Sequence, residues 1–571
     1  MAVRTRFREE VESKVKEALS DMGCDVRFDI EVPSTGVADL AVPCFTLAKV
    51  LRQAPQAIAA DLCKRIVCDG AVSSVEDVNG YLNFHIDQDV LVRETLKDIV
   101  SAGPDYGKHP AKGVKVNVEH TSINPTGPIH VGRARNPIIG DTLSRCLRRC
   151  GYDVETEYYV NDVGKQVVLL TWGVRNIPAS EVDPSDRDKN DHRLVPYYRK
   201  ANSIMEEDEA VREEISSMLQ RFENGDQEVI AKVREVAEMM LEGLRETLDT
   251  IDVRLDRYTW ESQYIADGSA RKVVDSLKES SYCGDSDGAY HLELKDFGIH
   301  GKNTRFTFTR GDGTTLYTTR DLAYHLDKFD RADRAVDVLG EDQKLGSQQL
   351  TAALQILGSD KKPEAMFYSF VALPEGKMST RRGTVVYLDD LIEEAVERAY
   401  EEVRSRREDL SEEEMRRIAV ITGVGAVRYN IVRVQPEKKM VFRWEDALNF
   451  DGNSGPFLQY SHARACSILR KAGDFERTVD EGLLTDDYER RLVSVLSMFP
   501  EVIRDCGENK RIHMLPSYGH ELASAFNQFY AAVPVLNSGD RRDSRLTLVD
   551  CARMVLKETL YTLGIIAPEE M

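Results

Sequence analysis

A histidine and a glycine stand where a predicted strand runs through a loop into a predicted helix. Alternating valines over 114–118 predict the strand, and apolar residues at helical spacing over 139–147 predict the helix, which Gly151 ends. A helix that begins with His130-Val131-Gly132-Arg133 is typical of a phosphate-binding corner, because free N–H groups and the helix dipole meet anionic oxygens there. Gly132 would let a flat purine approach the backbone. Taken alone, the tetrapeptide is explained more simply by a buried histidine beside a tight turn.

A second candidate site is the basic segment Lys377-Met378-Ser379-Thr380-Arg381-Arg382-Gly383. It follows a strand-like run over 366–373, and loops at the carboxyl ends of parallel strands are where open sheets collect ligands. A lysine and paired arginines there would hold a triphosphate and stabilise the charge that develops on departing pyrophosphate. Taken alone, the segment is better explained as a basic surface turn.

The order and separation of these two motifs resemble the HIGH and KMSKS signatures of class I aminoacyl-tRNA synthetases. Four further stretches are similar to arginyl-tRNA synthetase motifs, namely Ser122-Ile123-Asn124, Tyr317 to Asp321, Asn453 to Arg464 and the ending Ala567 to Met571. The resemblance covers nearly the whole chain. It implies that the carboxylate of L-arginine attacks the α-phosphate of ATP, bound with Mg²⁺, and that the arginyl group then passes to the terminal ribose of the tRNA for arginine.

The resemblance also implies roles for individual residues. Arginine carries a planar, permanently charged fork of donors, so its pocket needs carboxylates and aromatic acceptors at fixed angles. The implied arginine-binding residues are Ser122, Ile123, Asn124, Glu261, Tyr317, Asp321 and Gln343, with Asn124 and Gln343 on the α-amino and carboxylate groups. The implied ATP-binding residues are His130, Gly132, Arg133, Lys377, Met378, Ser379 and Arg381, of which His130, Lys377 and Arg381 are catalytic.

Some of these assignments have alternatives. Gln348 and Gln349 lie close to Gln343 in the sequence and compete with it for the same role. By residue type alone, Asp321 would be a helix-start aspartate and Tyr317 a core tyrosine. Glu119, directly before the loop, is either pocket lining or a strand end.

Two positions depart from the family pattern. Many members carry a second histidine where this chain has Arg133, and a fixed cation facing a cationic substrate would repel it. We therefore expect Arg133 to point at phosphate or tRNA. Thr380 stands where the KMSKS signature has its second lysine, so Lys377 and the two following arginines must supply the positive charge.

The chain divides into predicted regions of different type. Residues 1–110 look like an α+β module, with a strand over 26–32, a helix over 45–66 and a strand over 81–86. Residues 111–390 alternate strands and helices, which predicts an α/β Rossmann-type domain with a parallel sheet. A helical hairpin inserted over about 171–250 turns at Asn224-Gly225-Asp226, and a later strand pair turns at Gly311-Asp312-Gly313 and returns to Tyr317.

Helical signals dominate the rest of the chain. Residues 391–450 form a predicted helical connecting region and residues 451–571 a predicted all-α bundle. In the family that the chain resembles, the N-terminal module contacts the tRNA, the Rossmann domain performs the chemistry and the bundle binds the anticodon.

The composition narrows the class of protein. At 571 residues, 42% hydrophobic and 30% charged, the chain is a globular protein of several domains. A net charge of −21 argues against a protein that coats nucleic acid nonspecifically, although it leaves room for a local basic face. Ten scattered cysteines without C-x-x-C pairs predict reduced thiols and no protein-bound structural metal. Without a membrane-length apolar run or a signal peptide we expect a cytoplasmic protein, and the resemblance implies a monomer.

The predicted bundle also offers candidates for contact with tRNA. Single-stranded RNA is commonly read by stacking on aromatic side chains and by basic groups. The candidates are Tyr460, Arg464, Arg470 and Lys471, followed by Lys510, Arg511, Phe529 and Tyr530. For any one of them, a solvated charge or a core aromatic is the simpler explanation.

Other functions fit parts of the sequence. A cysteinyl-tRNA synthetase would need a thiolate-selective zinc site, which the cysteine spacing does not provide. A nucleotidylyltransferase would leave the helical third without a purpose. A non-catalytic RNA-binding relative of a synthetase would require a broken pocket, whereas Asn124, His130, Tyr317, Asp321 and Lys377 are all present. A dehydrogenase is disfavoured because no G-x-G-x-x-G follows a strand.

Overall fold

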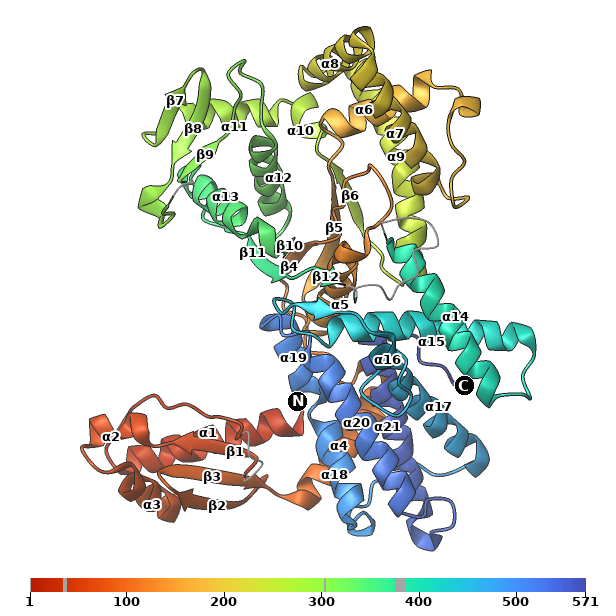
Figure 1. Cartoon of the computed structure of the whole chain (residues 1–571). Helices are drawn as coiled ribbons and strands as arrows, with labels where there is room; N and C mark the ends of the chain where they lie inside the picture. Colours follow the sequence, from red (N-terminus) through yellow and green to blue (C-terminus); the bar gives the residue numbers. More distant parts are fainter. Residues whose placement is uncertain (1, 34–37, 302–303, 373, 375–385) are drawn as a thin grey trace.

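Figure 1 shows the computed structural model, which describes residues 2–33, 38–301, 304–372, 374 and 386–571. The N-terminal module and a helical bundle lie at one end of the molecule, and the parallel-sheet domain with its insert lies at the other (Figure 1). The predicted fold class, an α+β module, a parallel-sheet domain with a helical insertion and a C-terminal helical bundle, is confirmed.

The central sheet has five parallel strands in the order β11-β10-β4-β5-β6. They are β4 (Lys115–Glu119), β5 (Asp153–Val160), β6 (Arg257–Trp260), β10 (Arg334–Gly340) and β11 (Glu364–Tyr368). Helix α5 (Arg135–Arg149), the predicted helix after the first strand, packs on β4, β5 and β10. The chain leaves β4 towards β5 and β6 on one side and returns later to β10 and β11 on the other. The winding therefore reverses between β4 and β10, and ligands of open parallel sheets bind at such a reversal.

Two helices connect the later strands of this sheet. Helix α12 (Tyr317–Arg331) precedes β10, and α13 (Lys344–Ile356) joins β10 to β11. The predicted return strand to Tyr317 is wrong: only an isolated bridge pairs Thr309 with Thr315, and Tyr317 opens α12. Before it lie α10 (Gln263–Ala266), α11 (Ser269–Lys278) and the antiparallel strands β7 (Cys283–Ser286), β8 (Ala289–Glu293) and β9 (Arg305–Thr307).

The N-terminal module is an antiparallel sheet, in the order β1-β3-β2, with helices. Its elements are α1 (Val3–Asp21), β1 (Leu40–Pro43), α2 (Phe45–Leu51), α3 (Pro55–Arg65), β2 (Val72–Val78) and β3 (Tyr81–Ile86). The strand predicted over 26–32 is wrong, since that stretch carries only a single bridge, from Glu31 to Ala41. The helix predicted over 45–66 is broken, because Arg52 adopts a left-handed φ of 54° and Pro55 starts a new helix.

Helix α4 (Gln88–Ala102) follows β3 but packs on the bundle, against α18 and α21 (Figure 1). Its Arg93 forms an ion pair of 2.7 Å with Glu481, and beyond the helix the Tyr106 hydroxyl donates to the Leu496 carbonyl at 3.1 Å. The segment that follows the N-terminal module is therefore anchored to the C-terminal helices.

The helical insertion contains more than a hairpin. It comprises α6 (Lys165–Asn176), α7 (Asn190–Glu207), α8 (Glu209–Glu223) and α9 (Gln227–Thr250). The predicted turn joins α8 to α9, with Gly225 at a φ of 83° and the Asp226 carboxylate capping the first amides of α9. The predicted hairpin is thus the second half of a larger helical group.

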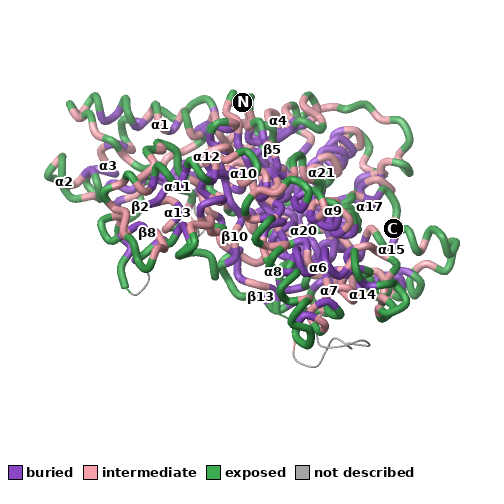
Figure 2. The backbone as a smooth tube through the Cα atoms, turned by 90° about the horizontal axis from the view of Figure 1, so that it is seen from above, coloured by how far each residue is buried: buried purple, intermediate pink, exposed green. Residues whose placement is uncertain are grey.

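The remaining helices form the C-terminal part. They are α14 (Leu388–Arg406), α15 (Glu412–Val432), α16 (Trp444–Ala447), α17 (Gly455–Ala472), α18 (Asp487–Ser497), α19 (Phe499–Glu508), α20 (Met514–Ala532) and α21 (Arg542–Thr562). A short parallel pair, β12 (Val371–Ala372) with β13 (Met440–Val441), ties them to the sheet domain. Figure 2 shows the buried segments gathered in the middle of the molecule and exposed segments around its rim. None of the described helices combines the length and apolarity that crossing a bilayer needs.

Candidate active site at the sheet edge

The described residues that we predict to bind arginine and ATP lie near the carboxyl edge of the central sheet. The loop after β4 carries Ser122 to His130, the residue after β6 is Glu261, and the 3₁₀ turn after β10 (Glu341–Gln343) ends in the exposed Gln343. Helix α12 begins with Tyr317 and brings Asp321 to the same region. Because β4 and β10 are neighbours at the point where the winding reverses, this edge is the site that the topology itself favours.

The His130 motif is held by hydrogen bonds of its own backbone. The His130 Nδ1 atom accepts from the Gly132 amide at 3.0 Å, and the Val131 amide donates to the Val386 carbonyl at 3.0 Å. The amides of Arg133 and Ala134 donate to the His130 and Val131 carbonyls at 2.9 and 3.0 Å. The free N–H groups expected at a phosphate corner are therefore used up, and a short 3₁₀ turn (Val131–Arg133) precedes α5.

Side chains remain as the ligand-facing groups of this motif. His130 is exposed, and partial burial together with the Arg133 charge lowers its pKa, which favours the neutral ring. The exposed Arg133 guanidinium lies 5.8 Å from the centre of the Phe370 ring. At Gly132 a Cβ atom would lie 3.1 Å from His130 Nδ1, so a side chain there would press on the histidine. Lys377, Met378, Ser379 and Arg381 lie outside the described residues.

The loop after β4 is fixed in an unusual backbone conformation. Thr121 and Ser122 have φ angles of 72° and 36°, a region of backbone conformation that residues other than glycine rarely adopt. The Thr121 amide donates to Asn136 Oδ1 at 2.7 Å, and the Ser122 hydroxyl accepts from the Tyr159 amide at 3.0 Å. The Ile123 carbonyl accepts from the Tyr158 hydroxyl at 2.6 Å, and Asn124 follows with an exposed side chain. Strain held by so many contacts is typical of a binding loop.

A chain of buried charges runs behind this loop. The Ser122 hydroxyl donates to Glu119 Oε1 at 3.0 Å, and Lys328 Nζ donates to Glu119 Oε2 and to Asp337 Oδ1, both at 2.7 Å. His325 Nε2 lies 3.0 Å from Asp337 Oδ2, and His325 Nδ1 lies 3.0 Å from Asp321 Oδ1. Two predicted site residues, Ser122 and Asp321, are thereby joined through Glu119, a candidate from the sequence, and through three groups that the sequence did not single out.

Glu261 has a partner within the chain. Its Oε1 atom accepts from Arg320 Nε at 2.5 Å, and Arg320 Nη1 also donates to the Thr315 carbonyl at 2.7 Å. With its amide nitrogen facing Glu261 Oε2, Asn161 donates to that atom at 2.9 Å. Burial raises the pKa of Glu261 to about 7, although Arg320 acts against it, and the Asp321 carboxylate adds to the rise. Glu261 and Asp321 thus lie close enough to influence each other.

Sequence reasoning missed five residues here: Tyr159, Arg320, His325, Lys328 and Asp337. Asp321, His325 and Lys328 lie on one face of α12, a spacing that was visible in the sequence. Asp337 is a lone carboxylate inside the apolar strand β10, which was also a signal of a buried ion pair. Tyr159 stacks on Tyr324 at 4.2 Å, and among the described residues its buried hydroxyl finds no hydrogen-bond partner.

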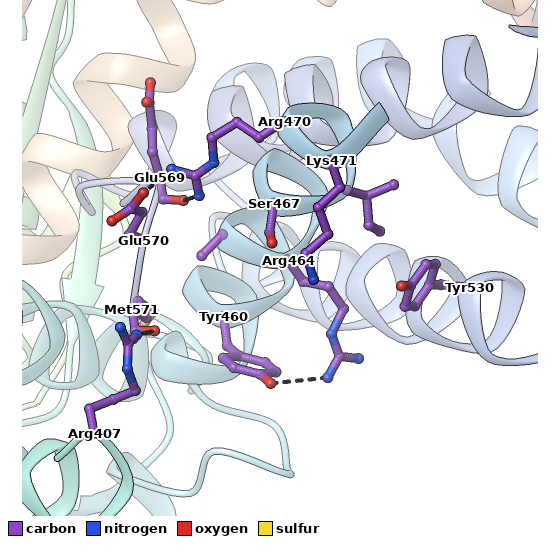
Figure 3. Close-up of a pocket in the computed structure, with 12 residues that line it drawn as sticks. Arg407, Tyr460, Arg464, Ser467, Arg470, Lys471, Tyr530, Glu569, Glu570 and Met571 are labelled. Atoms are coloured by element: carbon purple, nitrogen blue, oxygen red, sulfur yellow. Dashed lines mark hydrogen bonds and ion pairs between the residues drawn. The ribbon is translucent and has the colours of Figure 1, made fainter. Parts of the chain in front are cut away.

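A cavity of about 460 Å³ lies in the bundle, between α17 and the C-terminus (Figure 3). All four principal tRNA candidates, Tyr460, Arg464, Arg470 and Lys471, line it together with Arg407, Tyr530 and Met571. The Arg464 guanidinium donates to the Tyr460 hydroxyl at 3.2 Å and to Asn527 Oδ1 at 2.9 Å. Arg470 is paired with Glu570.

Other candidates from the bundle lie elsewhere. Phe529 is fully buried, so it is a core aromatic and not a stacking surface. Lys510 forms an ion pair of 2.6 Å with Glu364, and Arg511 pairs with Asp505 at 3.1 Å. The accessible aromatic groups of the cavity are Tyr460 and Tyr530.

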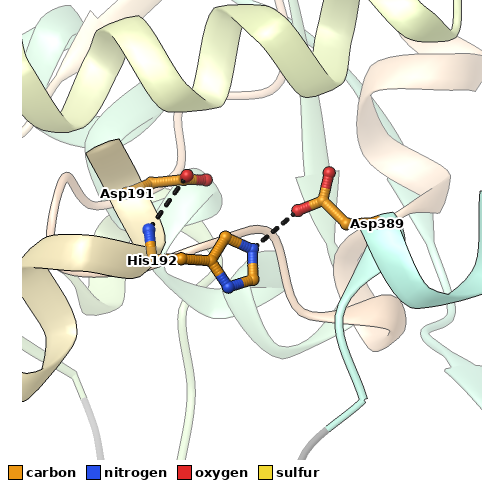
Figure 4. Close-up of side chains that lie close together, drawn as sticks. All are labelled: Asp191, His192 and Asp389. Carbon is orange, nitrogen blue, oxygen red and sulfur yellow. Dashed lines mark hydrogen bonds and ion pairs between the residues drawn. The ribbon is translucent and has the colours of Figure 1, made fainter. Parts of the chain in front are cut away.

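The residues Asp191, His192 and Asp389 come together where α7 meets the start of α14 (Figure 4). His192 Nε2 lies 2.9 Å from Asp389 Oδ2, and the Lys189 ammonium lies 2.9 Å from both Asp389 oxygens and 3.3 Å from Asp191. A lysine already supplies the positive charge that these carboxylates need. The cluster therefore fastens the insert to α14, and its chemistry does not require a metal ion.

Comparisons with known proteins show the family of each part of the chain. Residues 95–444 match the family model described as tRNA synthetases class I (R), catalytic domain. Residues 9–86 match the arginyl tRNA synthetase N terminal domain, and residues 458–571 match the DALR anticodon binding domain. The parallel sheet with its His130 motif is thus the catalytic domain of a class I aminoacyl-tRNA synthetase.

Relatives that match the whole chain show which family of class I aminoacyl-tRNA synthetases it belongs to. The arginine--tRNA ligase of Methanocella arvoryzae is 47% identical over 569 residues, covering 99% of this chain and 100% of the relative. That of Methanothermobacter thermautotrophicus is 41% identical over 570 residues, covering 99% of each chain. The structure of Thermus thermophilus arginyl-tRNA synthetase superposes with a TM-score of 0.83 at 29% identity, covering 99% of this chain and 100% of that one. The chain belongs to the arginyl-tRNA synthetase family.

Proposed function

We propose that this chain activates L-arginine with ATP to arginyl-adenylate and transfers the arginine to the 3′ end of the tRNA for arginine. The observation that carries the proposal is the partly exposed carboxylate of Asp321, held by His325 next to β10, where the winding of the sheet reverses. An acidic group with one open side suits a permanently charged guanidinium. A cysteinyl enzyme is not favoured, because the matched family models and relatives are those of arginine enzymes.

Arginine binding is assigned to the two rims of the site. On α12, Asp321 pairs with the guanidinium and the exposed ring of Tyr317 covers it. On the loop after β4, the Asn124 side chain and the backbone around Ser122 and Ile123 receive the α-amino group. Gln343, beyond β10, receives the carboxylate. Glu261 holds Arg320 in place and balances its charge beside the pocket.

ATP is a substrate and arrives with Mg²⁺. Because the backbone amides of the His130 motif are already bonded, the His130 ring and the Arg133 guanidinium are the groups offered to the nucleotide. Gly132 keeps the space beside the ring open. Lys377, Met378, Ser379 and Arg381 are proposed to hold the triphosphate and to balance the charge on pyrophosphate as it leaves.

The reaction needs little covalent chemistry from the protein. A carboxylate oxygen of arginine attacks the α-phosphorus, the bond to the β-phosphate oxygen breaks, and pyrophosphate leaves. A terminal ribose hydroxyl of the tRNA then attacks the arginyl carbonyl, loses its proton, and AMP leaves. Positioning of the reactants and stabilisation of phosphate charge account for such catalysis.

The tRNA is proposed to contact the cavity of Figure 3, where Tyr460 offers a stacking face and Arg464, Arg470 and Lys471 offer positive charge. The domain limits near residues 110, 390 and 450, a monomeric state and a cytoplasmic location complete the proposal.

The test is ATP–pyrophosphate exchange with each amino acid in turn, with and without total tRNA. Exchange that requires arginine, followed by charging of a tRNA that accepts arginine, is the expected result. Exchange that requires a different amino acid, or no exchange with arginine and tRNA together, would refute the proposed function.

A further inference from the structure

The net charge of the buried groups behind the binding loop follows from counting their carboxylates and basic groups. The set comprises three carboxylates, Glu119, Asp321 and Asp337, and two basic groups, His325 and Lys328, which we call the buried chain. Glu119 accepts from both the Ser122 hydroxyl and the Lys328 ammonium, so it is bonded as a carboxylate and not as an acid. The charge state of His325 decides the net charge of the set.

Both ring nitrogens of His325 face oxygen acceptors. Nδ1 lies 2.8 Å from the Asp321 carbonyl and 3.0 Å from Asp321 Oδ1, and Nε2 lies 3.0 Å from Asp337 Oδ2. A neutral imidazole has only one N–H, so the imidazolium is the species that satisfies both sides. Burial and the Lys328 charge lower the pKa of His325, but the Asp321 and Asp337 carboxylates outweigh them and raise it to about 10.

With His325 charged, the buried chain carries three negative and two positive charges. Asp321 is where the unbalanced charge reaches the surface, because its side chain is 32% exposed, against 12% for Glu119 and 3% for Asp337. Lys328 bonds one oxygen of Glu119 and one of Asp337. The other two oxygens of these carboxylates are bonded to Ser122 and His325, so Asp321 offers the most accessible carboxylate of the set. One open carboxylate edge remains for one cation.

We propose that His325 is a positioning residue: its imidazolium fixes the Asp321 carboxylate and reduces the charge of the buried chain to a single unit that matches one guanidinium. The inference rests on the proposed function, since it deepens the assignment of Asp321 to the arginine side chain. Buried ion pairs rarely add stability over apolar packing, so stability alone does not account for the buried chain. Positioning of Asp321 does. His325 touches no substrate and acts through Asp321.

The first experiment compares His325→Gln with the wild-type protein in arginine-dependent pyrophosphate exchange at saturating tRNA. Loss of an orienting partner behind a ligand-binding group typically costs about 10- to 100-fold in affinity. We expect the KM for arginine to rise by about that factor, while kcat and the KM for ATP change by no more than about twofold. Preference for arginine over its neutral isostere citrulline should fall in parallel.

His291→Gln is the matched control. His291 is also buried, lies 3.5 Å from a carboxylate of Glu293, and belongs to the separate antiparallel sheet on β8. It should leave the KM for arginine unchanged. A His325→Gln protein with an unchanged KM for arginine, or one whose kcat and KM for ATP deteriorate equally, would overturn the proposal.

A second measurement is made on the wild-type protein, and a variant serves only to identify the signal. In wild-type protein with ¹⁵N-labelled histidine, the His325 ring should show both nitrogens protonated at pH 8, when ordinary histidines are neutral. Its signals are identified by their absence in His325→Gln or His325→Asn, whichever folds. A neutral His325 at pH 8 would refute the inference even if the enzyme is active. Absence of arginine-dependent exchange in the wild-type protein would instead refute the proposed function.

Discussion

The two regions that we assign to substrates arrange charge in opposite ways. In the buried chain at the sheet edge each charged group is fixed by at least one partner, as Lys328 is by Glu119 and Asp337. In the cavity beside α17 the groups are open: Tyr460 is 41% and Tyr530 38% exposed, and basic side chains lie around them. The first region holds one unbalanced negative charge, whereas the second gathers positive charge on a protein whose net charge is −21.

This difference follows from what each region would bind. A small cation is told apart from a neutral isostere only where water is excluded and the protein groups cannot rearrange, because an unpaired charge is then costly. A polyanion with unpaired bases is held by many exposed contacts, each weak and screened by salt. Substitutions at the sheet edge should therefore have large effects on arginine, and substitutions in the bundle cavity smaller effects on tRNA.

The largest effect is expected for Asp321→Ala. Loss of the open carboxylate should weaken arginine binding by roughly 2 to 5 kcal/mol, the cost of breaking a desolvated charge pair. The KM for arginine in pyrophosphate exchange measures it. Asp330→Ala, on the exposed end of the same helix, is the control and should behave as the wild type. Equal arginine dependence in the two variants would remove Asp321 from the pocket.

Next comes Tyr460→Ala in the bundle cavity. A base stacked on an aromatic side chain contributes about 1 to 3 kcal/mol of binding free energy. The KM for tRNA should rise by the factor that corresponds to this energy, while the KM for arginine is unaffected. Tyr488→Ala serves as the control, since Tyr488 is 45% exposed but belongs to α18 and not to the cavity. If both tyrosines behave alike, the cavity is not the place where bases stack.

The sequence predicted different amounts of the structure in the two regions. Apolar periodicity located β4 and α5. Tyr460, Arg464 and Lys471 fall on one face of α17 because a helix brings residues four and seven apart together, and Arg470 lines the same cavity beside them. The spacing along α12 and the lone carboxylate of β10 were visible in the sequence, but the contacts between them could not be predicted. They depend on strand register, since Asp337 lies opposite Glu119 only once β10 pairs with β4. Periodicity within a segment says nothing about which distant segment becomes its neighbour.

Local patterns also failed where the backbone decides. Arg52 breaks a helix through a left-handed φ that its residue type does not suggest. The amides of the His130 motif were expected to be free for phosphate, but the stretch at Val386 and the His130 ring take them. Which donors remain free depends on partners from elsewhere in the chain.

The third prediction concerns pH at the sheet edge. Below pH 7 the Glu261 carboxyl is protonated, which leaves Arg320 unbalanced near the arginine site and repels the substrate. The KM for arginine should therefore fall as the pH rises from 6 to 8, by the factor that corresponds to about 1 kcal/mol of binding free energy. Glu261→Gln should remove this dependence.

The same group affects stability with a defined sign. Its pKa of about 7 in the fold lies above the unfolded value of about 4.3, so folding takes up a proton and the stability from this group falls as the pH rises between these values. In urea titrations across that window, Glu261→Gln should show a weaker decline than the wild type. A pH profile for arginine that is unchanged in the variant would contradict the assignment.

The smallest effects are expected for two arginines of α17, whose substitutions should change tRNA binding in different ways. Arg464 donates to Tyr460 and Asn527, and in the described part of the chain no carboxylate balances it, whereas Arg470 is paired with the exposed Glu570. Arg464→Ala should lower the slope of log affinity for tRNA against log salt by about 1, and Arg470→Ala should change affinity by about 0 to 1 kcal/mol with little change in slope. Filter binding at several salt concentrations measures both. If Arg470 changes the slope and Arg464 does not, the phosphate lies on the Glu570 side of the cavity, and the contrast between paired and open charges fails within this helix.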